Sequence, residues 1–134
     1  MPIKYWIERE RRRVRSVVTG DFTTEEIFQV LQEATTHEDF EVGFDVLSDH
    51  TQIGEPLTSL QAHQMTAYVE NMKEVMGHSR WAVVTTKPAS YGMMRMLSAM
   101  LEPVPIVIRI FDTLEEADDW LSQPKGEKEP SLQS

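Results

Sequence analysis

The chain of 134 residues contains no cysteine and no long apolar run. The missing thiols exclude disulfides, thiol catalysis and cysteine-based metal sites. The longest uninterrupted apolar stretches span only a few residues, as at 106–108, whereas a membrane-spanning helix needs about 20 apolar residues. The N-terminus also lacks the apolar core of a signal peptide. We therefore expect a cytoplasmic protein without a membrane span.

Complete catalytic and cofactor-binding motifs are missing as well. The six glycines are isolated, so they form neither a Gly-rich phosphate loop nor a Gly-x-Ser-x-Gly elbow. Three of the histidines, His37, His63 and His78, are scattered without the spacing of metal ligands. The sequence therefore predicts a protein that is not an enzyme, with no cofactor, no metal site and no catalytic residue.

Charge is unevenly distributed along the chain. The net charge is −9, which disfavours general nucleic-acid binding because phosphates require cations. Residues 1–15 nevertheless carry a net charge of +4, and the remainder carries −13. The run Arg11-Arg12-Arg13 is either a patch for an acidic partner or a hairpin turn with solvated arginines. The second interpretation is favoured, since a charge run is usually a solvated face.

Hydrophobic periodicity and turn residues predict alternating strands and helices. Strands are expected at 4–10, 13–19, 44–49, 80–86 and 106–111. Three helices are expected to begin at threonines with a Glu or Gln three residues later, the spacing of a capping box. These pairs are Thr23 and Glu26, Thr58 and Gln61, and Thr113 and Glu116. A further helix is expected to begin at a capping Ser90.

The element order is thus β-β-α-β-α-β-α-β-α, which predicts a single α/β domain at residues 1–122. The first two strands are expected to form an antiparallel hairpin. The later strands alternate with helices and are expected to be parallel. Residues 123–134 are polar, with too little apolar surface to offset the entropy of ordering, so a disordered tail is predicted there.

This order of elements resembles the STAS-like or SpoIIAA-like family. Short sequence segments resemble that family as well, and they lie at 18–23, 46–49, 81–84, 91–96 and 110–121. The resemblance covers residues 4–121. It implies a mixed five-stranded sheet with flanking helices, and it implies little about activity. Anti-sigma-factor antagonists of this fold carry a phosphorylatable serine directly after the central strand. Here that region reads Asp49-His50-Thr51, so the serine is missing.

Candidate site residues follow from the expected sheet, because ligands favour the carboxyl ends of parallel strands. The expected strand ends carry Asp49, His50, Thr51 and Lys87. His50 is the best acid–base candidate, since an ordinary histidine titrates near pH ~6.5. The alternative is that these are capping and loop residues, and that alternative is favoured for each residue taken singly.

Methionine is the unusual feature of the composition, because seven of the eight lie between residues 65 and 100. Met93 and Met96, on one face of the expected third helix, either line a lipid-like pocket or simply belong to the core, and the core is favoured. Met94 departs from that face, and we expect it to face a neighbouring chain. Arg95 either holds an acidic ligand or forms an ordinary ion pair.

These observations favour a binding or regulatory module that engages a partner protein or small ligand at the strand-end crevice. The alternative is a carrier of a small apolar or lipid-like ligand that uses the methionine-rich third helix. A homodimer that buries part of this helix is also predicted, because exposed apolar patches often mark interfaces.

Overall fold

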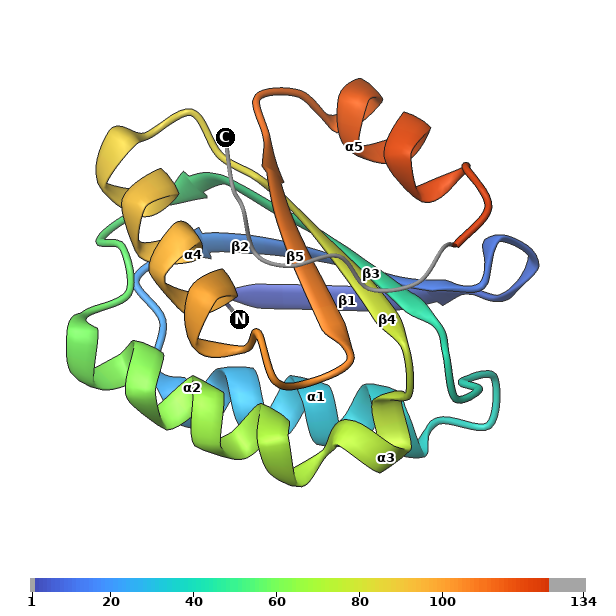
Figure 1. Cartoon of the computed structure of the whole chain (residues 1–134). Helices are drawn as coiled ribbons and strands as arrows, with labels where there is room; N and C mark the ends of the chain where they lie inside the picture. Colours follow the sequence, from blue (N-terminus) through green and yellow to red (C-terminus); the bar gives the residue numbers. More distant parts are fainter. Residues whose placement is uncertain (1, 126–134) are drawn as a thin grey trace.

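The computed structural model describes residues 2–125 of the chain. Five strands form one sheet in the order β1-β2-β3-β4-β5 (Figure 1). Strand β1 is antiparallel to β2, and all other neighbouring pairs are parallel. The strands are β1 (Ile3–Glu8), β2 (Arg13–Gly20), β3 (Asp45–Ile53), β4 (Ser79–Val84) and β5 (Ile106–Phe111). The prediction of a mixed five-stranded α/β sheet is confirmed.

Helices cover both faces of this sheet. Helices α1, α2 and α4 lie on one side, and α5 lies on the other (Figure 1). The α-helices of the described residues are α1 (Thr24–Thr36), α2 (Ser59–Asn71), α3 (Lys73–Met76), α4 (Pro88–Met100) and α5 (Leu114–Leu121). Sequence periodicity predicts one helix where the structure has α2 and the short α3. Gly77 ends α3 with a φ of 67°, a conformation that glycine adopts without strain.

The three predicted threonine caps are present. Thr23 and Thr58 each form a complete capping box, with Glu26 and Gln61 respectively. The Thr113 side chain accepts a hydrogen bond from the backbone of Glu116. These local signals set the start of α1, α2 and α5 because they satisfy backbone N–H groups that a helix leaves unpaired.

Helix α4 begins earlier than predicted. Its first residue is Pro88, preceded by Lys87 at the N-cap, and Ser90 is buried inside the helix instead of capping it. Proline suits the first helical position, because its φ is already helical and its missing N–H would have had no partner there. The buried residues of α4 are Ser90, Met94, Leu97 and Ser98, so the stripe that packs on the sheet is not the expected one with Met93 and Met96.

Strand β3 is longer than predicted. The sequence places His50 and Thr51 in a loop, whereas the strand continues to Ile53. Pairing with β4 ends at Asp49, opposite Val84, but pairing with β2 continues to Ile53. The register between β2 and β3 shifts after Asp49, which is the mark of a β-bulge. Because β2 pairs with β3 farther along than β4 does, His50 and Thr51 stay in the sheet.

Two apolar clusters form most of the core. Trp81, Val83 and Ile108 pack on the side of α2 and α4, and Leu47 packs on the side of α5. All four side chains are buried, whereas Ile110 on β5 is only half-buried.

The chain beyond α5 is packed against the domain as far as it is described. The backbone carbonyl of Gln123 accepts a hydrogen bond from Arg80, and the ammonium of Lys125 lies 3.1 Å from the Asp45 carboxylate. Gln123 and Lys125, at the start of the predicted tail, therefore contact the domain. Residues 126–134 of that predicted tail lie outside the described residues.

Candidate functional site

A cavity of about 100 Å³ lies between the sheet and the helices α1, α2 and α4. Most of its wall is apolar, and the sheet, α1, α2 and α4 all contribute to it. The lining includes Ile27, Met65, Trp81, Val83, Met94 and Ile108. Its polar side chains are Ser16, Ser48 and His50. A mostly apolar cavity with a few convergent polar groups is the usual form of a small-molecule site.

The arrangement of the helices explains why this space is open. On this side of the sheet the main contacts are those of α1 with β1 and of α4 with β5, and α2 bridges α1 and α4. The central strand β3 therefore lies beneath the gap between two helices. Accordingly Val46, Ser48 and His50, on the cavity face of β3, are only half-buried, although Leu47 on the other face is 1% exposed.

The polar end of the cavity is a chain of three side chains. Ser16 on β2 is directly opposite Ser48 on β3, and their hydroxyl oxygens are 2.8 Å apart. His50 lies two residues beyond Ser48 on the same face of the strand, since side chains alternate along a strand. Its Nε2 is 2.9 Å from the Ser48 hydroxyl. The three groups thus form one continuous hydrogen-bonded row along the floor of the cavity.

Burial lowers the pKa of His50 to about 4, because the cationic form loses its hydration in this environment. The neighbouring Asp49 carboxylate acts in the opposite direction but is the smaller effect. The imidazole is therefore neutral at pH 7, and it offers one N–H donor and one nitrogen acceptor.

The structure separates the other predicted strand-end residues from this cavity. Asp49 and Thr51 do not line it, and they hydrogen-bond to each other through the Thr51 hydroxyl and backbone N–H. The Lys87 ammonium donates to the backbone carbonyl of Ile53, which ties the start of α4 to the end of β3. Of the predicted residues of this group, only His50 lies in the cavity wall.

The predicted roles of residues on the third helix also change, because the stripe with Met94 and Leu97 packs on the sheet. Met94 was expected to face a neighbouring chain, but its side chain is 4% exposed and lines the cavity. Met93 and Met96 are half-buried and are not part of the lining. Arg95 is exposed and lies over the Tyr91 ring, 5.9 Å from its centroid. The methionines in the cavity wall are therefore Met65 and Met94.

Sequence reasoning missed the serines and Met65 as site residues. The available signal was the alternation of Val46, Ser48 and His50, which places two polar side chains on one face of a central strand. The opposite serine, Ser16, is identified only through the β2–β3 register, which the sequence does not state.

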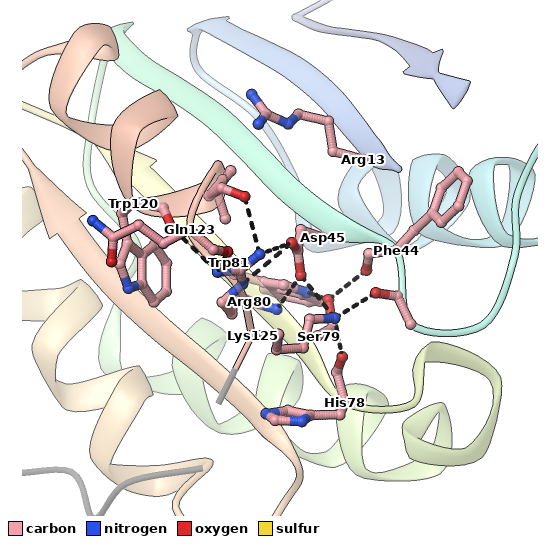
Figure 2. A network of polar contacts seen from close by, with 12 residues as sticks. Arg13, Phe44, Asp45, His78, Ser79, Arg80, Trp81, Trp120, Gln123 and Lys125 are labelled. Atoms are coloured by element: carbon pink, nitrogen blue, oxygen red, sulfur yellow. Dashed lines mark hydrogen bonds and ion pairs between the residues drawn. The ribbon is translucent and has the colours of Figure 1, made fainter. Parts of the chain in front are cut away.

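A second polar cluster, at the other end of the sheet, is structural (Figure 2). The Arg80 guanidinium donates two hydrogen bonds to the Asp45 carboxylate. Its remaining N–H groups donate to the backbone carbonyls of Trp120, Leu121 and Gln123. All five donors of this side chain are therefore used within the domain, and they hold the C-terminal end of α5 against the sheet.

The arginine run near the N-terminus is paired with acidic residues. Arg12 donates to Glu41, and both Arg11 and Arg13 donate to Asp118 on α5. The hydrogen bond from Arg13, followed by the positive charges of Arg13 and Arg11, lowers the pKa of Asp118. Arg13 is only 3% exposed, so the interpretation of this run as solvated arginines is wrong at that position.

Within residues 2–125, no group of three or more His, Asp or Glu side chains is placed to hold a metal ion. In the same part of the chain, no helix has the length and apolar character needed to cross a membrane.

Comparison with known proteins identifies the family. The SpoIIAA-like family model matches residues 13–122, so the chain belongs to the SpoIIAA-like family. It is a STAS-type domain, a class that is generally non-catalytic and often has a binding or regulatory role. No curated protein matches the chain.

A solved structure supports the fold. The crystal structure of an uncharacterised DUF3478-family protein with a SpoIIAA-like fold, from Shewanella loihica, has a TM-score of 0.61 to this chain at 20% sequence identity. The similarity covers 89% of this chain and 93% of that one. At this level of identity the likeness concerns the fold alone.

Proposed function

We propose that this chain is a non-enzymatic binding module that holds a small apolar molecule in the cavity beneath α1, α2 and α4. The cavity itself is the observation that carries the proposal. Core packing normally leaves few voids larger than a water molecule. Here about 100 Å³ is open over the central strand, and two flexible methionines, Met65 and Met94, line it. Methionine side chains adapt readily to the shape of an apolar ligand.

The Ser48–His50 pair is not proposed as a nucleophile and base. A general base works best with a pKa near the operating pH. Burial instead lowers the pKa of His50 to about 4, which makes its imidazole a weak base at neutral pH. We therefore assign these side chains to ligand binding.

Native mass spectrometry of freshly purified protein tests the proposal, together with a variant that fills the cavity. Val46→Phe adds a ring on the cavity face of β3. Val17→Phe is the matched control, because Val17 is also half-buried but alternates with the cavity residues Ser16 and Val18 and so lies on the opposite face of the sheet. We expect a co-purified small molecule in the wild type and the control and none in Val46→Phe.

Thermal unfolding of all three proteins confirms that each is folded. An equal co-purified mass in Val46→Phe and the wild type would place the ligand elsewhere.

The second candidate is a partner protein or polar ligand that engages the strand ends. Its support is that the ends of β2 and β3 and the N-cap of α4 lie together: Gly54 N–H donates to the Gly20 carbonyl, and the Lys87 ammonium donates to the Ile53 carbonyl. Asp49 and Thr51 are the other residues assigned to this site. Undiminished binding of an identified partner to Asp49→Ala and Thr51→Ala variants would remove this candidate.

A further inference from the structure

The cavity also carries information about the chemical class of its ligand, if the proposed function holds. Its polar groups converge at one end, and the rest of its wall is apolar. A molecule that fills it therefore has an apolar body and one polar end. The remaining question is whether that end is charged.

Among residues 2–125, the lining contains no counter-ion for a charged ligand. Of the side chains that form the wall, His50 is the single ionisable one, and none is lysine or arginine. Burying a carboxylate without a partner costs far more than burying a neutral polar group. Asp49, which lies between Ser48 and His50 in the sequence, would repel an anion. Its carboxylate accepts two hydrogen bonds from Thr51 outside the lining, so it is not placed to pair with a bound ammonium either.

The row Ser16–Ser48–His50 has spare capacity for a neutral oxygen. With a neutral imidazole, the three side chains supply three protons, one from each group. Within the described structure, two hydrogen bonds join them, and these use two of the protons. One proton and several lone pairs are left for a ligand. A hydroxyl can use both, and a carbonyl can accept the proton.

The volume sets the size of the ligand. An apolar cavity of about 150 Å³ in another protein holds benzene, which has six heavy atoms. The cavity of about 100 Å³ here suits a molecule of similar or smaller size. We propose that the site selects a small uncharged molecule with an apolar body and one hydroxyl or carbonyl oxygen, which bonds to the Ser16–Ser48–His50 row, and that it excludes the corresponding carboxylate and ammonium ions.

Nuclear magnetic resonance of protein labelled with ¹³C at the methionine methyl groups tests this selectivity, because the signals that shift show where each probe binds. The probes are 1-pentanol, pentane, pentanoate and pentylammonium at pH 7.5. We expect 1-pentanol to shift the Met65 and Met94 signals saturably, and to leave those of Met93 and Met96 nearly unchanged, because the latter do not line the cavity. Pentanoate and pentylammonium are expected to bind at least about 10-fold more weakly than the alcohol.

The outcomes separate this inference from the proposed function. If neither 1-pentanol nor pentane shifts Met65 and Met94, the cavity is not a binding site and both ideas fail. If pentanoate or pentylammonium binds there as tightly as 1-pentanol, the cavity binds ligands but the selection for uncharged molecules is wrong.

Ser48→Ala tests the role of the hydroxyl row. Removing one hydrogen-bonding partner is expected to weaken the binding of 1-pentanol by about 3- to 10-fold and to leave the affinity for pentane unchanged. Ser98→Ala is the matched control, because Ser98 is a buried serine that bonds to the Ile108 carbonyl away from the lining. Equal affinity of 1-pentanol for the wild type and Ser48→Ala would overturn the assigned role, and continued pentane binding shows that the variant is folded.

Discussion

His50 is the cavity residue whose protonation makes the stability of the fold depend on pH. Its folded-state pKa is about 4 because burial disfavours the imidazolium, whereas an unfolded histidine has a pKa near ~6.5. Below pH ~6.5 the unfolded chain therefore takes up a proton that the folded chain does not. The stability contributed by neutral His50 is fully present above pH ~6.5, and it is lost progressively as the pH falls toward 4.

We predict that His50→Gln flattens this pH dependence. Urea unfolding at several pH values between 7.5 and 4.5 should show a wild-type free energy of unfolding that falls by at most about 1.4 kcal/mol per pH unit from this group. His37→Gln, in an exposed loop, is the matched control for removing one histidine. Protonation of Asp118 also lowers the free energy of unfolding as the pH falls. This loss occurs mainly below pH ~4, because the pKa of Asp118 is lowered from an already acidic value. Identical slopes in the wild type and His50→Gln would contradict an imidazole that stays neutral in the folded protein.

Val83 is a second residue whose place can be tested. It is 5% exposed and lines the cavity from β4. Val83→Ala is expected to lower the free energy of unfolding by about 1–3 kcal/mol, through lost burial and an enlarged cavity. The measurement is a urea titration with Val107→Ala as the control, since Val107 is only half-buried. An unchanged midpoint for Val83→Ala would refute its place in the core.

At the scale of elements, Arg80 is one of the side chains that attach α5 to the sheet. Arg80 joins Asp45 to three carbonyls near the C-terminal end of α5, where a cation also interacts favourably with the helix dipole. Arg80→Met is expected to destabilise the protein by about 3 kcal/mol, at the lower end for a broken buried pair because Lys125 remains near Asp45.

Hydrogen exchange gives a local test of the same attachment. The amides of α5 should exchange faster in Arg80→Met, and those of α1 should change less. Arg109→Met is the matched control, because Arg109 also lies near the Trp120 ring but is exposed. Equal protection of α5 in Arg80→Met and the wild type would show that the helix is held by its apolar face alone.

The sequence predicts most of the elements because their signals are local. Threonine caps and apolar periodicity place α1, α2 and α5, and the run of β-branched residues places β5 at 106–111 as observed. Helix α4 begins at Pro88, whereas the sequence predicts a start at a capping Ser90. The face of α4 that packs on the sheet contains Met94 and not Met93, which exchanges their expected roles.

The candidate site was less predictable because it depends on non-local pairing. The sequence places His50 just beyond the end of its strand, whereas pairing with β2 holds it inside β3. The contact between Ser16 and Ser48 joins residues 32 positions apart and follows from register alone. The cavity itself results from where α1 and α4 lie on the sheet, which no single segment encodes.

At the scale of the whole molecule, the homodimer stays a prediction. Met94 cannot form its interface, since the side chain is buried, so the remaining surface on α4 is that around Tyr91 and Met93, which are half-buried. Light scattering at micromolar concentration should give the mass of two chains, and Met93→Glu should reduce it to one. A mass of one chain for the wild type would end the dimer prediction.

The central claim, that the cavity over β3 is a ligand site with a polar end, is tested most directly by a crystal structure with a small brominated alcohol. The probe 3-bromo-1-propanol is small enough for a cavity of about 100 Å³, and bromine is located by its anomalous scattering. We predict the bromine between Met65 and Met94 and the hydroxyl within hydrogen-bond distance of Ser16, Ser48 or His50. Bromine bound only on the surface, or an empty cavity at saturating probe, would contradict the claim.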